Sequence, residues 1–235
     1  LRGEYAEGWR EYEWRWRIPA FNAPARRFAQ PIWDGARTAG TILLHAEQGL
    51  GDTLQFARYA RLVAARCASV VLECQPELRL LMAGVPGVAH VVARGEQLPV
   101  FDAHAPLMSL PARFGSTLQD LPWDGPYVRA DSQRIERWRS VLAADAASLG
   151  AARLRVGLVW AGRPQQWDDR KRSISLASMA PLARAANTVF YSLQVGAAAA
   201  QSATPPPGMR LIDHAARIAD FSDTAALATL LDLVI

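Results

Sequence analysis

The strongest constraint on the fold is a regular alternation between short strand-type apolar segments and segments with the three- and four-residue spacing of helices. The strand-type segments of a first series are 41–47, 69–75, 88–94 and 99–105, and those of a second series are 155–162, 189–196, 209–215 and 232–235. Strands that alternate with helices in this way form parallel sheets with right-handed crossovers. The sequence therefore predicts an α/β protein with two Rossmann-like lobes that face each other.

One long predicted helix and several prolines mark the boundaries between these parts. The helix covers residues 131–150, with Asp131 as its N-cap and Gly150 at its end. The predicted parts are an amphipathic helix (1–17), a proline-containing linker (18–40), a first lobe (41–150) and a second lobe (151–235). The last apolar strand has nothing after it, although a buried parallel strand normally continues into a helix and a further strand. We therefore expect a fragment that stops within its second lobe.

The composition is that of a globular chain and excludes several other classes of protein. Of 235 residues, 51% are hydrophobic and 20% are charged. These values exclude a disordered tail, a collagen-like repeat and a small disulfide scaffold, and no apolar run approaches the ~20 residues of a membrane-spanning helix. The start of the chain has no signal-peptide core. Cys67 and Cys74 lack a CxxC spacing and a histidine cluster, so we expect reduced thiols, no zinc site and a cytoplasmic location.

The basic residues favour phosphate groups as ligands. The net charge is +4, and Lys171 is the only lysine among 26 basic residues. The arginines are scattered between acidic residues, whereas nucleic-acid-binding proteins concentrate their charge on one face. Because single arginines pair well with phosphates, the sequence favours a nucleotide diphosphate as ligand and disfavours nucleic acid.

A glycine-lined turn, Gly49-Leu50-Gly51-Asp52, lies between the first strand and the helix predicted over 53–66. Such a turn lets a ligand approach the backbone, where free N–H groups point outward. The simplest role for Asp52 is to cap the helix and complement its dipole. A catalytic role is the alternative, because a positioned carboxylate can accept a proton. The turn is not a GxGxxG motif, so dinucleotide binding is disfavoured.

The corresponding turn of the second lobe is Trp160-Ala161-Gly162, and the basic run Arg170-Lys171-Arg172-Ser173 follows it. Cations and hydroxyl groups held beside a departing nucleoside diphosphate would lower the barrier electrostatically. The alternative is a solvated basic loop. Asp168 and Asp169 could suggest a metal site, but we expect these carboxylates to pair with Arg170 and Lys171 and expect no metal.

Other polar residues follow predicted strands, where ligand sites of open α/β sheets gather. Gln194 could read a base or ribose through its amide, or could make a simple strand-end hydrogen bond. His104 and Ser109 would lie on the side of the first lobe that faces the cleft. We expect His45 to be buried in the first strand and assign no role to His90 or His214.

Six segments in order resemble bacterial tetratricopeptide-repeat proteins that carry a glycosyltransferase-like domain. They are HAEQGLGDTLQFARYARLV, VVLECQPELRLLMAGVPGV, FDAHAPLMSLP, VGLVWAGRPQQWDDRKRSI, FYSLQVG and DFSDTAALATLLDLVI. This domain is related to lipopolysaccharide heptosyltransferases and, more distantly, to protein O-GlcNAc transferases. The resemblance implies a GT-B fold with an acceptor lobe and a nucleotide-sugar lobe. It also implies that residues 1–17 are the end of a tetratricopeptide repeat.

The resemblance further implies an inverting, metal-independent glycosyltransferase without a cofactor, which moves a sugar from a nucleotide-sugar to a protein or glycan hydroxyl presented by upstream repeats. Asp52 would be the general base. The residues implied on the acceptor side are Gly49, Gly51, His104 and Ser109, and those implied on the donor and phosphate side are Arg172, Ser173, Lys171, Gln194 and Gly162.

The sequence also departs from this family. Gln166 and Asp168 stand where relatives have a histidine and an asparagine, and the chain ends before the family's Ser-Val-Asp-Thr and His-Leu-Ala segments. We therefore expect the fragment alone to be inactive. Two alternatives remain open: a noncatalytic protein-interaction scaffold with a degenerate transferase-like domain, and a nucleotide-binding protein without transfer.

Overall fold

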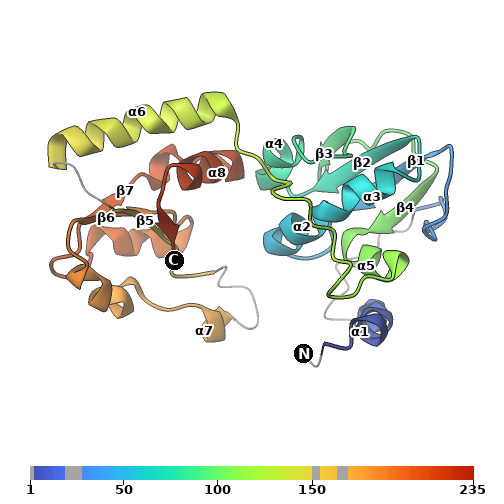
Figure 1. Cartoon of the computed structure of the whole chain (residues 1–235), viewed down its shortest axis with the longest axis horizontal. Helices are drawn as coiled ribbons and strands as arrows, with labels where there is room; N and C mark the ends of the chain where they lie inside the picture. Colours follow the sequence, from blue (N-terminus) through green and yellow to red (C-terminus); the bar gives the residue numbers. More distant parts are fainter. Residues whose placement is uncertain (1–2, 19–27, 150–153, 163–168) are drawn as a thin grey trace. The chain divides into compact units, whose positions relative to one another are not determined.

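The computed structural model describes residues 3–18, 28–149, 154–162 and 169–235. The chain divides into two units, Leu1–Arg129 and Ala130–Ile235. Each unit contains one four-stranded parallel sheet flanked by helices (Figure 1). The parallel sheets predicted from the sequence are confirmed.

The sheet of the first unit has the strand order β3-β2-β1-β4. Its strands are β1 (Thr41–His45), β2 (Ser69–Cys74), β3 (His90–Ala93) and β4 (Ala103–Pro106). At the centre of the sheet, Leu44 lies beside Leu72 of β2 and Ala105 of β4, and all three are fully buried. Burial on both faces explains why these strands are continuous apolar runs in the sequence.

Short helices follow the strands of this sheet. After β1 come α2 (Leu50–Phe56), the 3-10 turn η3 (Ala57–Tyr59) and α3 (Ala60–Ala64), and after β2 come η4 (Pro76–Leu78) and α4 (Arg79–Met82). After β4 come η5 (Leu107–Ser109) and α5 (Leu110–Phe114). The helix predicted over 53–66 is therefore present, but it begins earlier and a 3-10 turn interrupts it.

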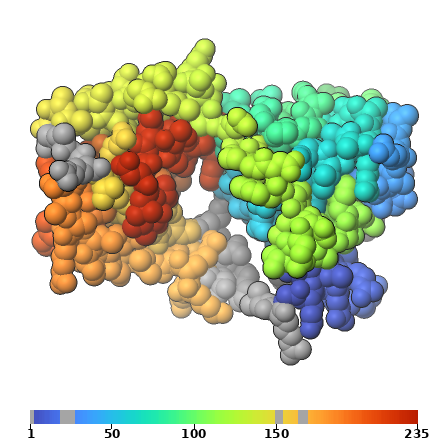
Figure 2. All heavy atoms as spheres, in the orientation of Figure 1, coloured from blue at the N-terminus to red at the C-terminus, as the bar shows by residue number. Residues whose placement is uncertain are grey.

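The amphipathic segment at the N-terminus belongs to the first unit. It forms α1 (Tyr5–Tyr12) and the 3-10 helix η1 (Glu13–Arg17), and α1 packs against α5 (Figure 2). The indole Nε1 of Trp9 donates to the carbonyl oxygen of Ser116 at 3.0 Å, and its ring meets Phe56 edge to face. These contacts place Trp9, one ring of the predicted aromatic face, against the rest of the first unit.

The sheet of the second unit has the order β7-β6-β5-β8. Its strands are β5 (Leu154–Leu158), β6 (Thr188–Ser192), β7 (Leu211–Asp213) and β8 (Leu233–Val234). Its helical elements are α6 (Ser132–Leu149), α7 (Asp169–Arg172), η6 (Leu176–Arg184), η7 (Ala197–Ala203), η8 (Ala215–Arg217) and α8 (Phe221–Thr229). None of the helices that the structure describes is long and apolar enough to span a membrane.

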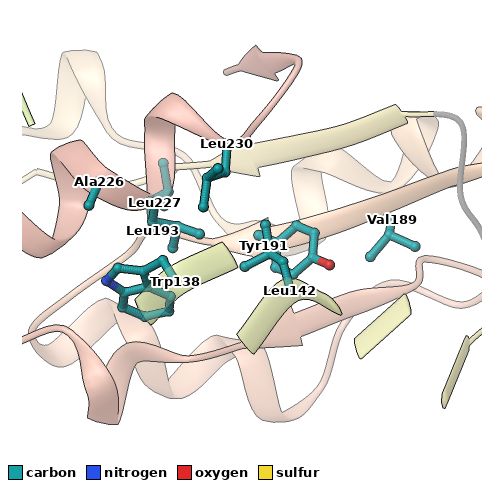
Figure 3. Close-up of a cluster of buried hydrophobic side chains, with 8 residues drawn as sticks. All are labelled: Trp138, Leu142, Val189, Tyr191, Leu193, Ala226, Leu227 and Leu230. Carbon is teal, nitrogen blue, oxygen red and sulfur yellow. The ribbon is translucent and has the colours of Figure 1, made fainter. Parts of the chain in front are cut away.

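The long helix α6 packs on the second sheet, so the predicted lobe boundary at residue 150 is wrong. Its apolar face joins β6 and α8 in one core, formed by Trp138, Leu142, Val189, Tyr191, Leu193, Ala226, Leu227 and Leu230 (Figure 3). Asp131 accepts the backbone N–H of Arg134 at 2.9 Å, which confirms it as the N-cap. The predicted C-terminal residue Gly150 lies outside the described residues.

The segment predicted as a helix over 176–187 is the 3-10 helix η6. Pro181 lies inside it and has no N–H to donate, which disfavours a continuous α-helix there. Leu176 and Met179 of this segment pack with Phe190 on the face of the sheet opposite α6. The sheet of the second unit is therefore covered on both faces.

Candidate functional site

The turn after β1 holds Asp52 by a hydrogen bond to its own helix terminus. Asp52 Oδ2 accepts the backbone N–H of Gly49, the N-cap of α2, at 2.9 Å. The capping role predicted for Asp52 is therefore confirmed. Its second oxygen, Oδ1, accepts no hydrogen bond from the residues that the structure describes. Because the side chain is half-buried, one oxygen is fixed while the other remains available to a ligand.

Hydrogen bonds from buried polar side chains hold this turn in place. Gln75, which follows β2, donates from Nε2 to the carbonyl oxygen of Gln48 at 2.8 Å. Thr53 Oγ1 donates to Gln75 Oε1 at 2.8 Å. Thr53 is 1% exposed and Gln75 is 9% exposed, and a buried polar group that is fully paired holds its neighbours in one geometry. The position of Asp52 is thus set by the ends of two adjacent strands.

A buried ion pair lies at the same edge of the sheet. Arg15 of η1 is 5% exposed and binds Glu47, two residues after β1, through Nη2–Oε1 and Nε–Oε2 contacts of 2.9 and 3.2 Å. Glu13 Oε1 accepts from Arg15 Nη1 at 2.6 Å. Burial raises the pKa of Glu47, and the paired guanidinium of Arg15 opposes that shift. Neither Arg15 nor Glu47 was predicted as a site residue, although Glu47 is the last residue of the strand predicted over 41–47.

Ser109 lies at the same edge of the sheet, and the N-terminal segment occupies its hydroxyl group. Its Oγ accepts from Arg15 Nη2 at 2.7 Å and donates to Glu13 Oε2 at 3.0 Å. The preceding residue, Met108, donates its N–H to Glu47 Oε1 at 3.1 Å. Ser109 therefore anchors η1 to the end of β4, and the predicted direct contact with an acceptor is corrected.

His104 is a core residue rather than an acceptor contact. It is 7% exposed, and its Nδ1 lies 3.2 Å from His45 Nε2, with the Phe28 ring centroid 4.7 Å from the His104 ring. Burial lowers the pKa of His104. The predicted burial of His45 in β1 is confirmed. The imidazoles of His45 and His104 lie on the same face of the sheet and pack against Phe28, which explains why both point into the protein.

The two glycines of the turn differ in their surroundings. A Cβ on Gly51 would meet nothing within 4 Å, so the surface above it is open. A Cβ on Gly49 would lie 3.2 Å from Asp52 Oδ2. Neither residue requires a left-handed backbone. The open surface at Gly51 is the place where a ligand could approach α2 closely.

In the second unit, three of the predicted donor-side residues come together around one carboxylate. Ser173 Oγ accepts the N–H of Gly162 at 2.8 Å and donates to Asp169 Oδ1 at 2.7 Å. Arg172 Nε lies 3.4 Å from the same oxygen. Asp169 thus pairs with Arg172 and Ser173. The prediction paired Asp168 and Asp169 with Arg170 and Lys171, and Asp168 lies outside the described residues.

A side chain at position 162 would crowd the groups around it. A Cβ there would lie 2.5 Å from Arg172 Nη2 and 2.7 Å from Asp169 Oδ1. The Arg172 side chain is 54% exposed, so its outer guanidinium nitrogens remain accessible to an anion. Lys171 is exposed on α7. Gln166 and Asp168, which depart from the family pattern, lie outside the described residues.

Gln194 supports this turn rather than presenting its amide to a ligand. Its Oε1 accepts from the backbone N–H groups of Trp160 and Ala161 at 3.1 and 2.9 Å. Its Nε2 donates to the carbonyl oxygens of Ala161 and Val195 at 3.1 and 2.9 Å. The side chain is therefore fully hydrogen-bonded, and the strand-end role is the one that the structure shows.

The described residues contain no cluster of three or more His, Cys, Asp or Glu side chains that could hold a metal ion. Cys67 and Cys74 are free thiols. Burial raises the pKa of Cys74 to about 12, so it stays protonated at neutral pH. The candidate sites therefore consist of the two turns and the charged side chains around them.

Comparison with known proteins supports the fold assignment. No family model and no curated protein matches the sequence. The structure is similar to E. coli ADP-heptose lps heptosyltransferase II, with a TM-score of 0.53 and 14% identity over 83% of this chain and 78% of that chain. It is also similar to a family 9 glycosyl transferase from Veillonella parvula DSM 2008, with a TM-score of 0.51 and 8% identity over 85% of this chain and 76% of that chain. The chain thus has an α/β fold with parallel sheets, similar to that of GT-B glycosyltransferases.

Proposed function

We propose that this protein is an inverting glycosyltransferase that moves a sugar from a nucleotide-sugar to an acceptor hydroxyl. The observation that carries the proposal is the hydrogen bonding of the Asp52 carboxylate. One carboxylate oxygen is fixed by the Gly49 N–H, and the other is unpaired among the described residues. A base must be positioned and must still have a lone pair for the incoming proton. The fold shared with two glycosyltransferases supports the same reaction class.

In the proposed reaction, Asp52 Oδ1 takes the proton of the acceptor hydroxyl as that oxygen attacks the anomeric carbon. The bond between this carbon and the nucleotide's β-phosphate oxygen breaks, and the nucleoside diphosphate leaves with the electron pair. Attack from the face opposite the leaving group inverts the anomeric centre. Neither a cofactor nor a metal ion is needed for this proton and charge balance.

The negative charge that develops on the leaving diphosphate requires a cationic partner. Arg172 supplies accessible guanidinium N–H groups, which suit the bidentate geometry of a phosphate. Asp169 holds the Nε side of that guanidinium, and Gly162 leaves room for it. We assign Arg172 as the main phosphate contact, with Lys171 beside it on α7. Ser173 and Gln194 act indirectly, because they shape the turn.

A noncatalytic scaffold is the second candidate. The observation that favours it is the pairing of Asp169 with both Arg172 and Ser173, which partly neutralises the charge offered to a phosphate. A scaffold of this kind would bind no nucleotide-sugar. Binding therefore separates the two candidates before any turnover is measured.

The test compares thermal stabilisation and turnover of the full-length protein with UDP-, GDP- and ADP-sugars. We expect one donor class to raise the melting temperature of the wild-type protein and of Asp52→Asn. Turnover by Asp52→Asn should fall by about 10²- to 10⁴-fold, because that is the usual contribution of a general base. Arg172→Gln should lose stabilisation by the donor. Matched controls are Asp34→Asn, an exposed turn aspartate that accepts the N–H of Ala36, and Arg170→Gln on the same short helix as Arg172.

Two results would contradict the proposal. If none of the three donor classes stabilises the wild-type protein, the scaffold is favoured. If Asp52→Asn turns over the donor at the wild-type rate, Asp52 is only a helix cap and the base assignment fails.

A further inference from the structure

The last residue of α1 lies against the turn that carries Asp52. Gln48 Nε2 donates to Tyr12 Oη at 3.2 Å, and Gln48 immediately precedes Gly49. Tyr12 is half-buried. Tyr12 is distant from this turn in the sequence and belongs to α1, outside the sheet. It nevertheless lies at the edge of the sheet at which β1 ends.

The buried ion pair holds Tyr12 in this place. Arg15 Nη1 donates to the carbonyl oxygen of Tyr12 at 3.1 Å, and the guanidinium carbon lies 4.8 Å from the centroid of the Tyr12 ring. The same guanidinium is bound to Glu47 and Ser109. The ring position therefore follows from a buried network that includes the ends of β1 and β4, and not from a loose surface contact.

Three side chains of this edge each keep one hydrogen-bonding function that no described residue uses. Tyr12 Oη accepts from Gln48, and its own O–H donates to none of the residues that the structure describes. Gln48 Oε1 and Asp52 Oδ1 are acceptors without a partner among the described residues. Burial raises the pKa of Tyr12, with the charges of Asp52 and Glu47 adding to the effect, while Gln48 and Arg15 oppose it. The phenol therefore keeps its proton well above neutral pH.

We infer that Tyr12, Gln48 and Asp52 form the acceptor subsite and that the acceptor is a saccharide, bound through neighbouring ring hydroxyl groups. The inference rests on the proposed glycosyltransferase function. One donor and two acceptors grouped around a single turn match vicinal hydroxyls, because each hydroxyl both donates and accepts. A peptide would instead need backbone N–H and C=O partners along an extended edge. In this arrangement Tyr12 determines acceptor specificity, and Asp52 deprotonates the hydroxyl that attacks.

The test uses simple glycosides as probes, so that it does not depend on the identity of the natural acceptor. Binding of methyl α-D-glucoside, methyl α-D-mannoside and methyl β-D-galactoside is measured by saturation-transfer NMR, together with a serine- and threonine-rich peptide. We expect at least one glycoside to bind and the peptide not to bind. Tyr12→Phe removes only the phenol O–H and should weaken glycoside binding about 3- to 10-fold, as expected for one hydrogen bond.

The matched control is Tyr5→Phe, which removes a phenol O–H from the same helix, away from the turn, and should leave glycoside binding unchanged. Gln48→Met is a second variant that should act in the same direction as Tyr12→Phe, since Gln75 holds the backbone oxygen of Gln48 and not its side chain. Equal binding by wild type, Tyr12→Phe and Gln48→Met would overturn the inference. Binding of the peptide instead of all three glycosides would overturn it as well.

Donor binding, measured on the same samples, separates this inference from the proposed function. If a sugar nucleotide stabilises the protein but no glycoside binds, the acceptor subsite is refuted while the transferase proposal stands. If a glycoside binds through Tyr12 but no sugar nucleotide binds, the saccharide subsite is supported and the transferase proposal fails.

Discussion

The two units place their buried charges differently with respect to their candidate sites. In the first unit, the buried pair Arg15–Glu47 lies at the site itself and joins η1 to the ends of β1 and β4. In the second unit, Asp223 of α8 is buried and binds Arg134 and Arg137 of α6, whereas the candidate site depends on the exposed Arg172. Site geometry and stability should therefore be coupled in the first unit and separable in the second.

The largest effect should come from Arg15→Met. This change leaves the Glu47 carboxylate buried without its cation, which typically costs about 3–5 kcal/mol of folding free energy. Hydrogen exchange measured by mass spectrometry should increase across residues 5–17 and 47–53 together, because one network holds both. Chemical denaturation of wild type and variant gives the magnitude. Arg17→Met, an exposed arginine on the same 3-10 helix, should change stability by less than about 0.5 kcal/mol.

The pH dependence of this variant gives a second check. Without Arg15, burial should raise the pKa of Glu47 further. When the pKa of a carboxyl group is raised in the folded state, the protein keeps its full folding free energy below the unfolded-state pKa, about 4.3. Part of that free energy is lost as pH rises through the folded-state pKa. The difference between wild type and Arg15→Met should therefore shrink on acidification. An equal difference at pH 4 and pH 7 would show that the cost arises from lost packing.

Asp223→Asn should have a smaller effect, confined to stability. Burial raises the pKa of Asp223, but the N–H of Ala219, the indole of Trp138 and the two arginines outweigh it, so the pKa lies below its ordinary value. We expect a loss of about 2 kcal/mol, because these are hydrogen bonds to a charged group with partly exposed partners. A lowered pKa makes this stabilisation complete above about pH 4, and it is lost as pH falls through the folded-state pKa.

Denaturation at pH 7 and pH 3 tests Asp223→Asn. The wild type should lose stability on acidification and approach the variant. The control is Asp213→Asn, which should be close to neutral because Asp213 is exposed at the end of β7 and accepts the N–H of Ala215. Affinity for the sugar nucleotide should be unchanged in Asp223→Asn. A loss of affinity there would show that stability and site are coupled in the second unit too.

The strands and the main turns could be predicted from the sequence, because each depends on a local pattern. A strand buried on both faces, such as β1 or β6, requires a continuous apolar run. The capping role of Asp52 follows from its place three residues after Gly49. The grouping of Gly162, Arg172 and Ser173 followed from a strand end followed by a basic run. These features need no knowledge of contacts distant in the sequence.

The rest could not be predicted, because it depends on pairs that no spacing encodes. Arg15 and Glu47 are 32 residues apart, and an arginine among tryptophans gives no sign of burial. Gln194 and Ser173 are residue types that often contact ligands, but here both are hydrogen-bonded to the turn that contains Gly162. The assignment of α6 to the second unit depends on Trp138 packing against α8. In each case the side chain is hydrogen-bonded to, or packed against, another part of the protein itself.

The smallest effect on stability should come from Gly162→Ala, which tests whether the second site can be altered alone. The new Cβ would displace the Arg172 guanidinium and the Asp169 carboxylate, since these side-chain ends yield more easily than the backbone. We expect donor affinity to fall about 3- to 10-fold, the value of one hydrogen bond, with the melting temperature unchanged. Gly51→Ala is the matched control: its Cβ would enter open space in α2, so donor affinity should be unchanged and stability equal or higher by about 0.5–1 kcal/mol. A fall in stability of Gly162→Ala comparable to that of Asp223→Asn would mean that the second unit, like the first, uses its site to hold its fold.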